Sequence, residues 1–287
     1  MQRIKKIIGL LALSSIFLGS NAQAFSISPL KYESTIASGE SQNFLMSVEN
    51  DSNSAHFYQL VMVGAKQDQN GRLVFEKNID VAENWIKFKE NQVEVESKEK
   101  KDVVFTISVP KNTPPGGHYI GVGVEEKNDQ GVSARLMMVM TFQVAGIANE
   151  ALRLENFYPT KKYFFDNNWS HFLQLKNIGN INLAMAGNIK VLFANDKAVF
   201  FSTIDLGSKL FSGSSRNVNI KSAPEKLIFP GRYQAVLTIY YGLTNQQIIS
   251  AINFWYLPVW FLSSVLILIV LLFLFFIFKK RNHEMVE

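Results

Sequence analysis

The sequence contains few residues of the kinds that carry out metal, nucleophilic or acid–base chemistry. Its 287 residues include no cysteine and four histidines, His56, His118, His171 and His283. The histidines are scattered and show no metal-binding spacing such as His-Glu-x-x-His. The absence of cysteine excludes thiol catalysis, cysteine-ligated zinc, iron–sulfur clusters and disulfides. We therefore expect no metal site and no cofactor.

Two segments rich in glycine and serine match catalytic or phosphate-binding loops in composition only. Pro114–Gly117 lacks the Lys-Ser/Thr pair of a phosphate loop and precedes a strand pattern instead of a helix. Ser212–Ser215 has no marked base that would activate a serine, and the sequence has no Gly-x-Ser-x-Gly pattern. We interpret the first segment as a turn and the second as a loop, and we predict that the protein is not an enzyme.

Trp85 is the candidate ligand-binding residue, and the ligand itself is not identified by the sequence. Its ring could stack on the face of a sugar, whereas a single tryptophan in an all-β domain more often belongs to the core. Both interpretations stay open. The mixed-charge segment Glu94–Asp102 is interpreted as a solvated hairpin loop.

The N-terminus has the pattern of a secretory signal peptide over residues 1–24. Three basic residues among the first six precede the apolar run Ile7–Leu18, and small and polar residues follow, ending at Ala22-Gln23-Ala24. This pattern predicts cleavage after Ala24, with Phe25 as the first mature residue. A run of about a dozen apolar residues is too short to cross a bilayer comfortably. An uncleaved N-terminal anchor is the alternative.

A second apolar block, Val259–Phe278, has 20 residues and no charge. At about 1.5 Å rise per residue it would span roughly 30 Å, the thickness of the hydrocarbon core. Its flanks are aromatic on one side and basic on the other: Trp255, Tyr256 and Trp260, then Lys279, Lys280 and Arg281. Amphipathic rings favour the membrane interface, and basic residues favour the cytoplasm. We predict a transmembrane helix over 259–278, a cytoplasmic tail over 279–287, and residues 25–258 outside the cell membrane.

The positive charge of the chain comes mainly from its two ends. The sequence has 29 Lys and Arg against 24 Asp and Glu, a net charge of +5. Six of the basic residues belong to the N-terminal cluster and to the cluster after the apolar block, so residues 25–258 are close to neutral. The charge therefore reflects export and membrane orientation, and we expect no nucleic-acid partner.

Short runs with strand-like alternation fill residues 25–258. In Val104–Val109, for example, Phe105, Ile107 and Val109 share one face, and Thr106 and Ser108 share the other. Similar runs are separated by glycine, proline, asparagine and aspartate at the spacing expected of β-sandwiches. They are Asn43–Val48, His56–Val63, Tyr119–Val124, Leu136–Val144, Phe172–Lys176, Ile189–Phe193, Val218–Ile220, Tyr233–Tyr241 and Ile248–Trp255. The pattern predicts an all-β fold.

Two repeated features predict two tandem immunoglobulin-like sandwiches. A strand pattern ends on asparagine at Asn50 and again at Asn177, and Pro-Gly opens a strand pattern at Pro115–Tyr119 and at Pro230–Tyr233. Asparagine tolerates left-handed backbone and Pro-Gly suits type II turns, which gives both repeats a conformational reason. We place the boundary near Gly146, so that the sandwiches cover residues 25–146 and 147–258, each of ordinary domain size.

The motifs of the mature chain together resemble the WxL-interacting protein family. They include turn and strand signals from both halves: Phe25–Leu30, Gly39-Glu40, Val48–Asn50, Trp85, Val109-Pro110, Pro114–Tyr119, Leu175–Asn180, Gly187–Val191, Ser215-Arg216, Pro230–Tyr233 and Phe254–Pro258. The resemblance implies a first domain that contacts peptidoglycan, a second domain that contacts a partner surface protein, and a C-terminal anchor at the bacterial surface. It implies no catalytic residues.

The sequence thus predicts a non-catalytic, membrane-anchored cell-envelope protein. Its partners would be the lipid bilayer, peptidoglycan or another cell-wall glycan, and a secreted or surface protein, in an adhesion or scaffold role. The alternative is a membrane-tethered chaperone that assembles secreted surface proteins, since an open edge strand can pair with a client strand. A hydrolase on a β scaffold is a third hypothesis. Fold alone does not decide among these functions.

Overall fold

The structure, a computed structural model, describes residues 25–127, 133–193, 197–224 and 229–284. The chain divides into two compact units. The first contains the chain up to Ala65, Phe75–Thr113 and His118–Phe142, and the second contains Lys66–Val74, Pro114–Gly117 and the chain from Gln143. The second unit thus includes two short segments that precede the predicted boundary at Gly146.

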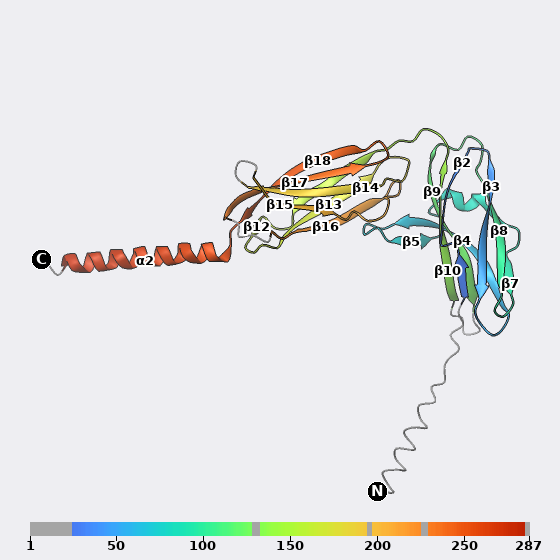
Figure 1. Cartoon of the computed structure of the whole chain (residues 1–287), viewed down its shortest axis with the longest axis horizontal. Helices are drawn as coiled ribbons and strands as arrows, with labels where there is room; N and C mark the ends of the chain where they lie inside the picture. The colour runs from blue at the N-terminus through green and yellow to red at the C-terminus, as the bar shows by residue number, and fades with distance from the viewer. Residues whose placement is uncertain (1–24, 128–132, 194–196, 225–228, 285–287) are drawn as a thin grey trace, which may run out of the picture. The chain divides into compact units, whose positions relative to one another are not determined.

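Two sheets form the first sandwich (Figure 1). One sheet has the order β1 (Phe25–Ser28), β3 (Ser41–Asn50), β8 (Lys100–Ser108) and β6 (Ile86–Phe88). The other has the order β2 (Lys31–Ile36), β10 (Ser133–Val144), β9 (Gly116–Lys127), β4 (His56–Gln67) and β5 (Leu73–Glu76), and β7 (Gln92–Val95) also pairs with β4. A 3-10 helix, η1 (Val81–Trp85), precedes β6.

Alternating side chains of both sheets build the first core. On β3, Phe44, Met46 and Val48 point inward, and on β8, Phe105 and Ile107 do the same. Phe44 and Phe105 face each other in the antiparallel register, with their rings stacked 5.5 Å apart. Such cross-strand aromatic pairs stabilise a sheet beyond the area that they bury.

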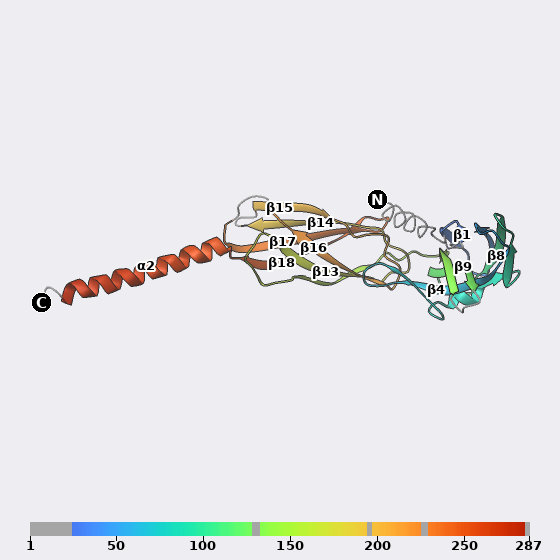
Figure 2. The same cartoon turned by 90° about the horizontal axis from the view of Figure 1, so that it is seen from below.

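Two further sheets form the second sandwich, whose strands run side by side in both views (Figure 1, Figure 2). The smaller sheet has the order β11 (Leu152–Pro159), β13 (Trp169–Asn177) and β16 (Ser215–Ser222). The larger has the order β12 (Tyr163–Phe164), β18 (Gln246–Tyr256), β17 (Gly231–Tyr241), β14 (Met185–Phe193) and β15 (Lys197–Ile204).

An aromatic cluster occupies one end of the second core. The buried Trp169 ring lies 5.0 Å from the Tyr233 ring, 4.9 Å from that of Phe254 and 5.5 Å from that of Tyr256. These residues come from β13, β17 and β18, so the cluster joins the two sheets. Buried aromatic rings in such offset and edge contacts contribute strongly to core stability.

His171 lies in the same core and is fully buried. The rings of Phe157, Phe164 and Phe254 surround it at 6.3, 6.4 and 5.3 Å. Neither of its ring nitrogens has a hydrogen-bond partner among the described residues. Burial lowers the pKa of His171 to about 4, because the charged imidazolium is disfavoured where water is excluded.

Asn50 and Asn177, the asparagines that repeat in the sequence, brace a loop in each sandwich. The Asn177 side-chain amide donates to the carbonyls of Ile181 (2.7 Å) and Leu210 (2.9 Å), and its side-chain oxygen accepts from the Gly179 N–H (2.9 Å). Asn50 makes the equivalent contacts in the first sandwich. Neither asparagine has a positive φ. The reason inferred from the sequence, left-handed backbone, is therefore wrong; the repeat reflects side-chain hydrogen bonding.

Side-chain and backbone hydrogen bonds explain why Lys66–Val74 belongs to the second unit. The Gln67 amide donates to the Lys209 carbonyl (3.0 Å) and accepts from the Phe211 N–H (3.0 Å). The Asn217 N–H donates to the Gln69 carbonyl at 2.6 Å. These contacts join residues about 140 positions apart, so the local sequence pattern could not assign the segment.

The single described α-helix, α2 (Val259–Glu284), follows β18 after two residues. Its stretch Val259–Phe278 is long and apolar enough to span a membrane, and none of that stretch is buried. The structure confirms the predicted fold class: two tandem immunoglobulin-like β-sandwiches followed by an apolar helix. Of the predicted cleavage residues, Ala22 and Ala24 lie outside the described residues, and Phe25 begins β1.

Candidate ligand-binding site

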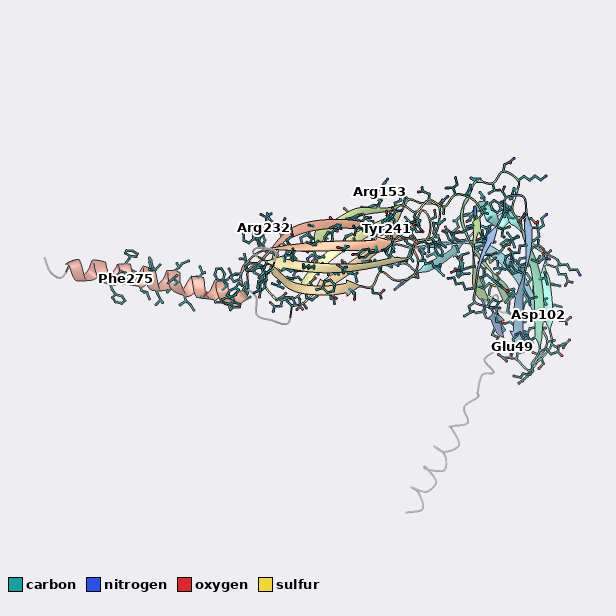
Figure 3. The ribbon with its side chains drawn as sticks, turned by 45° about the horizontal axis from the view of Figure 1, so that its top comes forward. Glu49, Asp102, Arg153, Arg232, Tyr241 and Phe275 are labelled. Atoms are coloured by element: carbon teal, nitrogen blue, oxygen red, sulfur yellow. The ribbon has the colours of Figure 1, made fainter. Side chains whose placement is uncertain are left out.

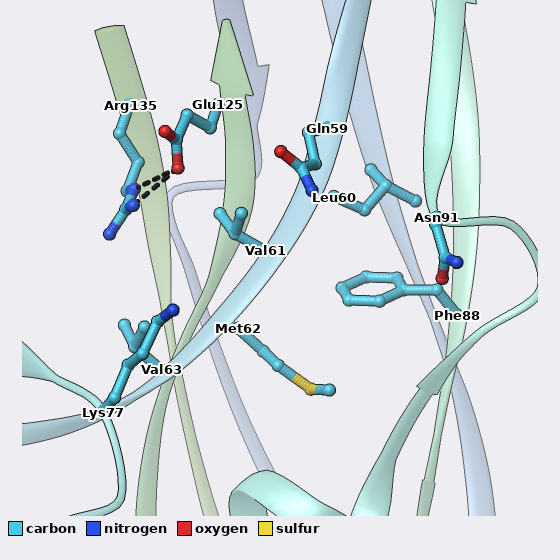
Figure 4. Close-up of a pocket in the computed structure, with 10 residues that line it drawn as sticks. All are labelled: Gln59, Leu60, Val61, Met62, Val63, Lys77, Phe88, Asn91, Glu125 and Arg135. Carbon is cyan, nitrogen blue, oxygen red and sulfur yellow. Dashed lines mark hydrogen bonds and ion pairs between the residues drawn. The ribbon is translucent and has the colours of Figure 1, made fainter. Parts of the chain in front are cut away.

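A pocket of about 450 Å³ lies within the first sandwich (Figure 4). Five consecutive residues of β4 line it, Gln59, Val61 and Val63 on one face of the strand and Leu60 and Met62 on the other, and side chains from segments far apart in the sequence complete it. The lining residues are Gln59, Leu60, Val61, Met62, Val63, Lys77, Phe88, Asn91, Glu125 and Arg135. Its size is within the range of small-molecule and oligosaccharide sites.

An ion pair forms one side of the pocket. Nε and Nη2 of Arg135 donate to the same oxygen of Glu125, at 3.2 and 2.5 Å, as the dashed lines in Figure 4 mark. Glu125 is nearly buried, whereas Arg135 is exposed. Because Arg135 neutralises the carboxylate, the exposed ammonium group of Lys77 leaves this side of the pocket with a net positive charge.

Strand pairing positions the polar groups around an apolar floor. Gln59 stands opposite Glu125, Val61 opposite Gly123, and Val63 opposite Gly121 in the antiparallel register of β4 and β9. The two glycines contribute no side chains to this face of β9. The floor between the amide of Gln59 and the charged groups is therefore aliphatic, as Figure 4 shows for Val61 and Val63.

The opposite side of the pocket is amphipathic. Phe88 and Met62 provide apolar surface, and Asn91 provides a side-chain amide (Figure 4). The Asn91 carbonyl accepts a hydrogen bond from the Leu60 N–H at 2.9 Å, which fixes the loop after β6 against β4. Amides and charges beside apolar surface are typical of a site that binds and orients a ligand.

The pocket residues do not form an acid–base pair of the kind used to cleave glycosides. Such a pair requires two carboxyl groups on either side of the bond, about 5 to 9.5 Å apart. Among the ten lining residues Glu125 is the only carboxylate, and Arg135 holds it in an ion pair. The described arrangement supplies recognition groups: two amides, two cations, one carboxylate and an aromatic ring.

Trp85, the candidate identified from the sequence, does not line this pocket. It is half-buried at the end of η1, with its ring 4.7 Å from the His118 ring and 6.2 Å from that of Phe142. His118 Nδ1 bonds to Asp80 Oδ1 at 2.8 Å, and Asp80 also caps η1 by accepting from the Ala82 N–H. Trp85 thus packs in a cluster that fastens η1 to β9.

The Asp80 carboxylate holds that cluster together. Its burial favours the neutral acid, but hydrogen bonds from His118 and from the N–H groups of Ala82 and Tyr119 favour the carboxylate. The balance lowers the pKa of Asp80 below its ordinary value. A charged, fully engaged aspartate of this kind serves the local structure.

The structure separates the residues predicted to flank the membrane. Trp255 and Trp260 are exposed, and α2 begins between them. Tyr256 is only 3% exposed, because its ring packs against Trp169 and its hydroxyl donates to Asn167 Oδ1 at 2.6 Å. The structure therefore removes Tyr256 from the residues that can face lipid. The side chains of Lys279, Lys280 and Arg281 lie outside the described residues.

The pocket residues were missed because they carry no local motif. One signal was present: in Gly121, Gly123 and Glu125 every second residue of an otherwise apolar strand is a glycine or a charge. Glycine in a strand marks a place where other atoms approach the backbone closely. Here the ring of Phe75 lies where a Gly121 Cβ would be, and the carbonyl of Leu136 lies where a Gly123 Cβ would be.

No protein-family model matches the sequence, and no curated protein matches it. Among solved structures the chain is similar to the class 5 fimbriae chaperone CfaA (13% identity, TM-score 0.44, covering 82% of this chain and 100% of that one). It is also similar to the CsuC–CsuE chaperone–tip subunit complex of Acinetobacter baumannii (14% identity, TM-score 0.39, covering 82% of this chain and 100% of that one). A third similar structure is that of Salmonella enterica SafA pilin with the SafB chaperone (10% identity, TM-score 0.40, covering 83% of this chain and 98% of that one). Likenesses this distant carry no argument about the function of this chain.

Proposed function

We propose that this chain is a non-catalytic, membrane-anchored cell-envelope protein whose first sandwich binds a cell-wall glycan. The pocket between β4, β9 and β10 carries the proposal. Peptidoglycan fragments offer carboxylates for Lys77 and Arg135, amides and hydroxyls for Gln59 and Asn91, and methyl groups for the aliphatic floor. The resemblance to the WxL-interacting family points to the same class of ligand.

Membrane anchoring and export complete the proposal. The stretch Val259–Phe278 would hold the chain in the bilayer, and the basic residues after it would keep the tail of 279–287 in the cytoplasm. The signal pattern of residues 1–24 would deliver both sandwiches to the outer side. The pocket would then lie on the same side of the membrane as the cell wall.

Removing the charge of Lys77 is expected to weaken binding of a soluble muropeptide by up to about fivefold. An exposed ion pair contributes about 0.2–1 kcal/mol, and about 1.4 kcal/mol corresponds to a factor of ten. The measurement is calorimetric titration of the full chain in lipid nanodiscs, comparing wild type with Lys77→Gln. Lys77 is exposed, so its replacement does not disturb the core.

Lys87→Gln is the matched control, because Lys87 is also exposed but does not line the pocket. It should bind like wild type. Equal binding by wild type and Lys77→Gln would show that the pocket is not the site. Failure of the wild-type chain to bind any muropeptide would remove the glycan as the ligand.

A chaperone for secreted surface proteins is the second candidate, favoured by the edge strand β15. It is the last strand of its sheet, and Phe201 on it is 63% exposed. A strand edge of this kind can add a strand from a client protein, with apolar side chains providing specificity.

Deleting the gene in its host is expected to impair assembly of surface proteins if this second function is correct. Complementation with Phe201→Glu should then fail, because a charge beside the edge opposes pairing with an apolar client strand. Ala186→Glu, at an exposed position of the central strand β14, is the matched control for the added charge. Normal surface assembly in the deletion strain, measured by surface proteomics, would exclude the chaperone function.

A further inference from the structure

The end of the second sandwich from which the chain enters α2 carries a group of exposed aromatic rings. They belong to β12 and the residue after it, to the turn before β17 and to the end of β18: Tyr163, Phe165, Phe229 and Trp255. Phe229 is 70% exposed. We call these four residues the aromatic collar. Exposed aromatic side chains gathered in this way mark an interaction surface.

Backbone pairing holds the collar on the sandwich framework. Tyr163 stands beside Trp255 in the parallel pairing of β12 with β18. The Trp255 N–H donates to the Lys162 carbonyl (3.0 Å), and the Leu257 N–H donates to the Phe164 carbonyl (2.8 Å). Phe229 is fixed two residues before Gly231, which pairs with Tyr256. The collar is therefore attached to β12, β17 and β18, and β18 leads directly into α2.

Basic residues surround the collar. Lys161, Lys162 and Arg232 are exposed, and Arg232 stands next to Trp255 in the pairing of β17 with β18. The Lys162 ammonium lies 5.6 Å from the centre of the Tyr163 ring. Asp166 is the acidic residue of the same loop, so the net charge of these four residues is positive. Figure 3 shows Arg232 at this end of the sandwich and Tyr241 toward the other.

The chain between the collar and the membrane is very short. β18 ends at Tyr256 and α2 begins at Val259, three residues later. Three extended residues span at most about 10 Å. The whole bilayer is about 40–45 Å thick and its hydrocarbon core about 30 Å, so the headgroup layer on each side is about 5–7.5 Å thick. If Val259 enters the hydrocarbon core, the end of β18 must lie in or against the headgroups.

We propose that the aromatic collar and its three basic neighbours bind the headgroup layer of the leaflet that α2 enters, with anionic phospholipid preferred. Aromatic rings with a polar edge favour this depth of the membrane. Each lysine or arginine near an anionic surface adds to the electrostatic attraction. This binding would fix the second sandwich on the membrane instead of leaving it free on its link. The proposal rests on insertion of α2, which belongs to the proposed function.

The other end of the same hairpin provides an internal control. Leu243, in the turn between β17 and β18, is 93% exposed and stands alone among polar residues. Its neighbour Thr244 and its own N–H are bonded to the Glu150 carboxylate. Strands of 11 residues separate this turn from the collar by roughly 36 Å, at about 3.3 Å per residue.

Because the chain has no cysteine, single-cysteine variants can be spin-labelled at one chosen position. We would compare Phe229→Cys, Leu243→Cys and Ile269→Cys in the full chain, reconstituted into phosphatidylcholine nanodiscs with and without phosphatidylglycerol. The readout is collision of the label with a water-soluble nickel relaxation agent. The label at 229 should be protected several-fold relative to that at 243, and more strongly when phosphatidylglycerol is present.

The label at position 269 in α2 distinguishes failure of the collar proposal from failure of the membrane anchor. Suppose that the label at 269 is protected but the label at 229 is as accessible as the label at 243. That result would overturn the collar proposal and leave the membrane anchor intact. An accessible label at 269 would mean that α2 does not insert, which overturns the anchor and the collar together.

Charge variants test the preference for anionic lipid. Combining Lys161→Gln, Lys162→Gln and Arg232→Gln should abolish the additional protection of position 229 by phosphatidylglycerol. Arg153→Gln, Lys176→Gln and Lys190→Gln are the matched control: they remove the same charge from other strands and should leave the lipid dependence unchanged. If the collar variant keeps the full lipid dependence, the basic residues do not bind the headgroups.

Discussion

Acidification from pH 6.5 to pH 5 is expected to lower the free energy of unfolding of the second sandwich by about 2 kcal/mol, rising to about 3 kcal/mol at pH 4. The cause is His171, which is fully buried among phenylalanine rings and whose pKa is lowered to about 4. An exposed histidine in the unfolded chain has a pKa near 6.5.

The sign of the effect follows from which state binds the proton. Above pH 6.5 the imidazole is neutral in both the folded and the unfolded chain, so it makes no pH-dependent contribution. Between pH 6.5 and 4 the unfolded chain binds a proton and the folded sandwich does not, so stability is lost as the pH falls. Below pH 4 the folded sandwich is protonated as well, and the loss from this residue levels off.

Hydrogen exchange of the β13 amides in the full chain in nanodiscs would measure this loss, after correction for the pH dependence of intrinsic exchange. The range from pH 6.5 to 5 is the most informative, because ordinary carboxylates are still ionised there. His171→Leu should remove most of the pH dependence, since His171 is the only histidine between residues 143 and 258. His118→Gln changes a histidine of the first unit and should leave the pH dependence of the second sandwich unchanged. Equal pH dependence in wild type and His171→Leu would refute the assignment.

Asn177→Asp is expected to destabilise the second sandwich by about 3–5 kcal/mol at neutral pH, the cost of leaving a buried charge without a partner. The Asn177 amide donates to the carbonyls of Ile181 and Leu210, and its side chain is fully buried. A carboxylate of the same shape has no N–H to donate and would face both carbonyl oxygens with a negative charge.

Asn177→Ala should cost less than Asn177→Asp, because it removes the hydrogen bonds without introducing a charge. The same exchange measurement on β13 and β16 would rank the two variants. Asn188→Asp, at a half-buried position of β14 that does not brace a loop, is the matched control and should cost under about 1 kcal/mol. A smaller effect of Asn177→Asp than of Asn177→Ala would contradict the bracing role.

The central strands of both sandwiches could be predicted from the sequence, because one of their faces is buried. Alternation at Tyr233, Ala235, Leu237 and Ile239 is enough to identify β17. Most of the edge strands were missed for the converse reason. β12 has two residues and exists only through its pairing with β18, and β2 exposes half of its side chains. A strand that depends on its neighbour leaves little periodicity of its own.

The binding pocket could not be predicted, because sheet topology creates it. Gln59 and Glu125 are 66 positions apart in the chain and become neighbours only when β4 pairs with β9. The repeated asparagines were predicted only in part. Their position was identified correctly, but left-handed backbone was the wrong reason, because hydrogen bonds from Asn177 to Leu210 require the folded loop to exist.

The attachment of β18 to α2 has a mechanical consequence. If α2 is inserted in a membrane as proposed, tension on α2 reaches the second sandwich at Tyr256, the last residue of β18. β18 is held by eleven register pairs with β17 on one side and by β12 on the other. Because the hydrogen bonds of an antiparallel pair lie across the strands, a force along the strand loads them together in shear instead of opening them one by one. A link built in this way would resist tension between α2 and the sandwich, and covalent cross-links are not needed for that resistance.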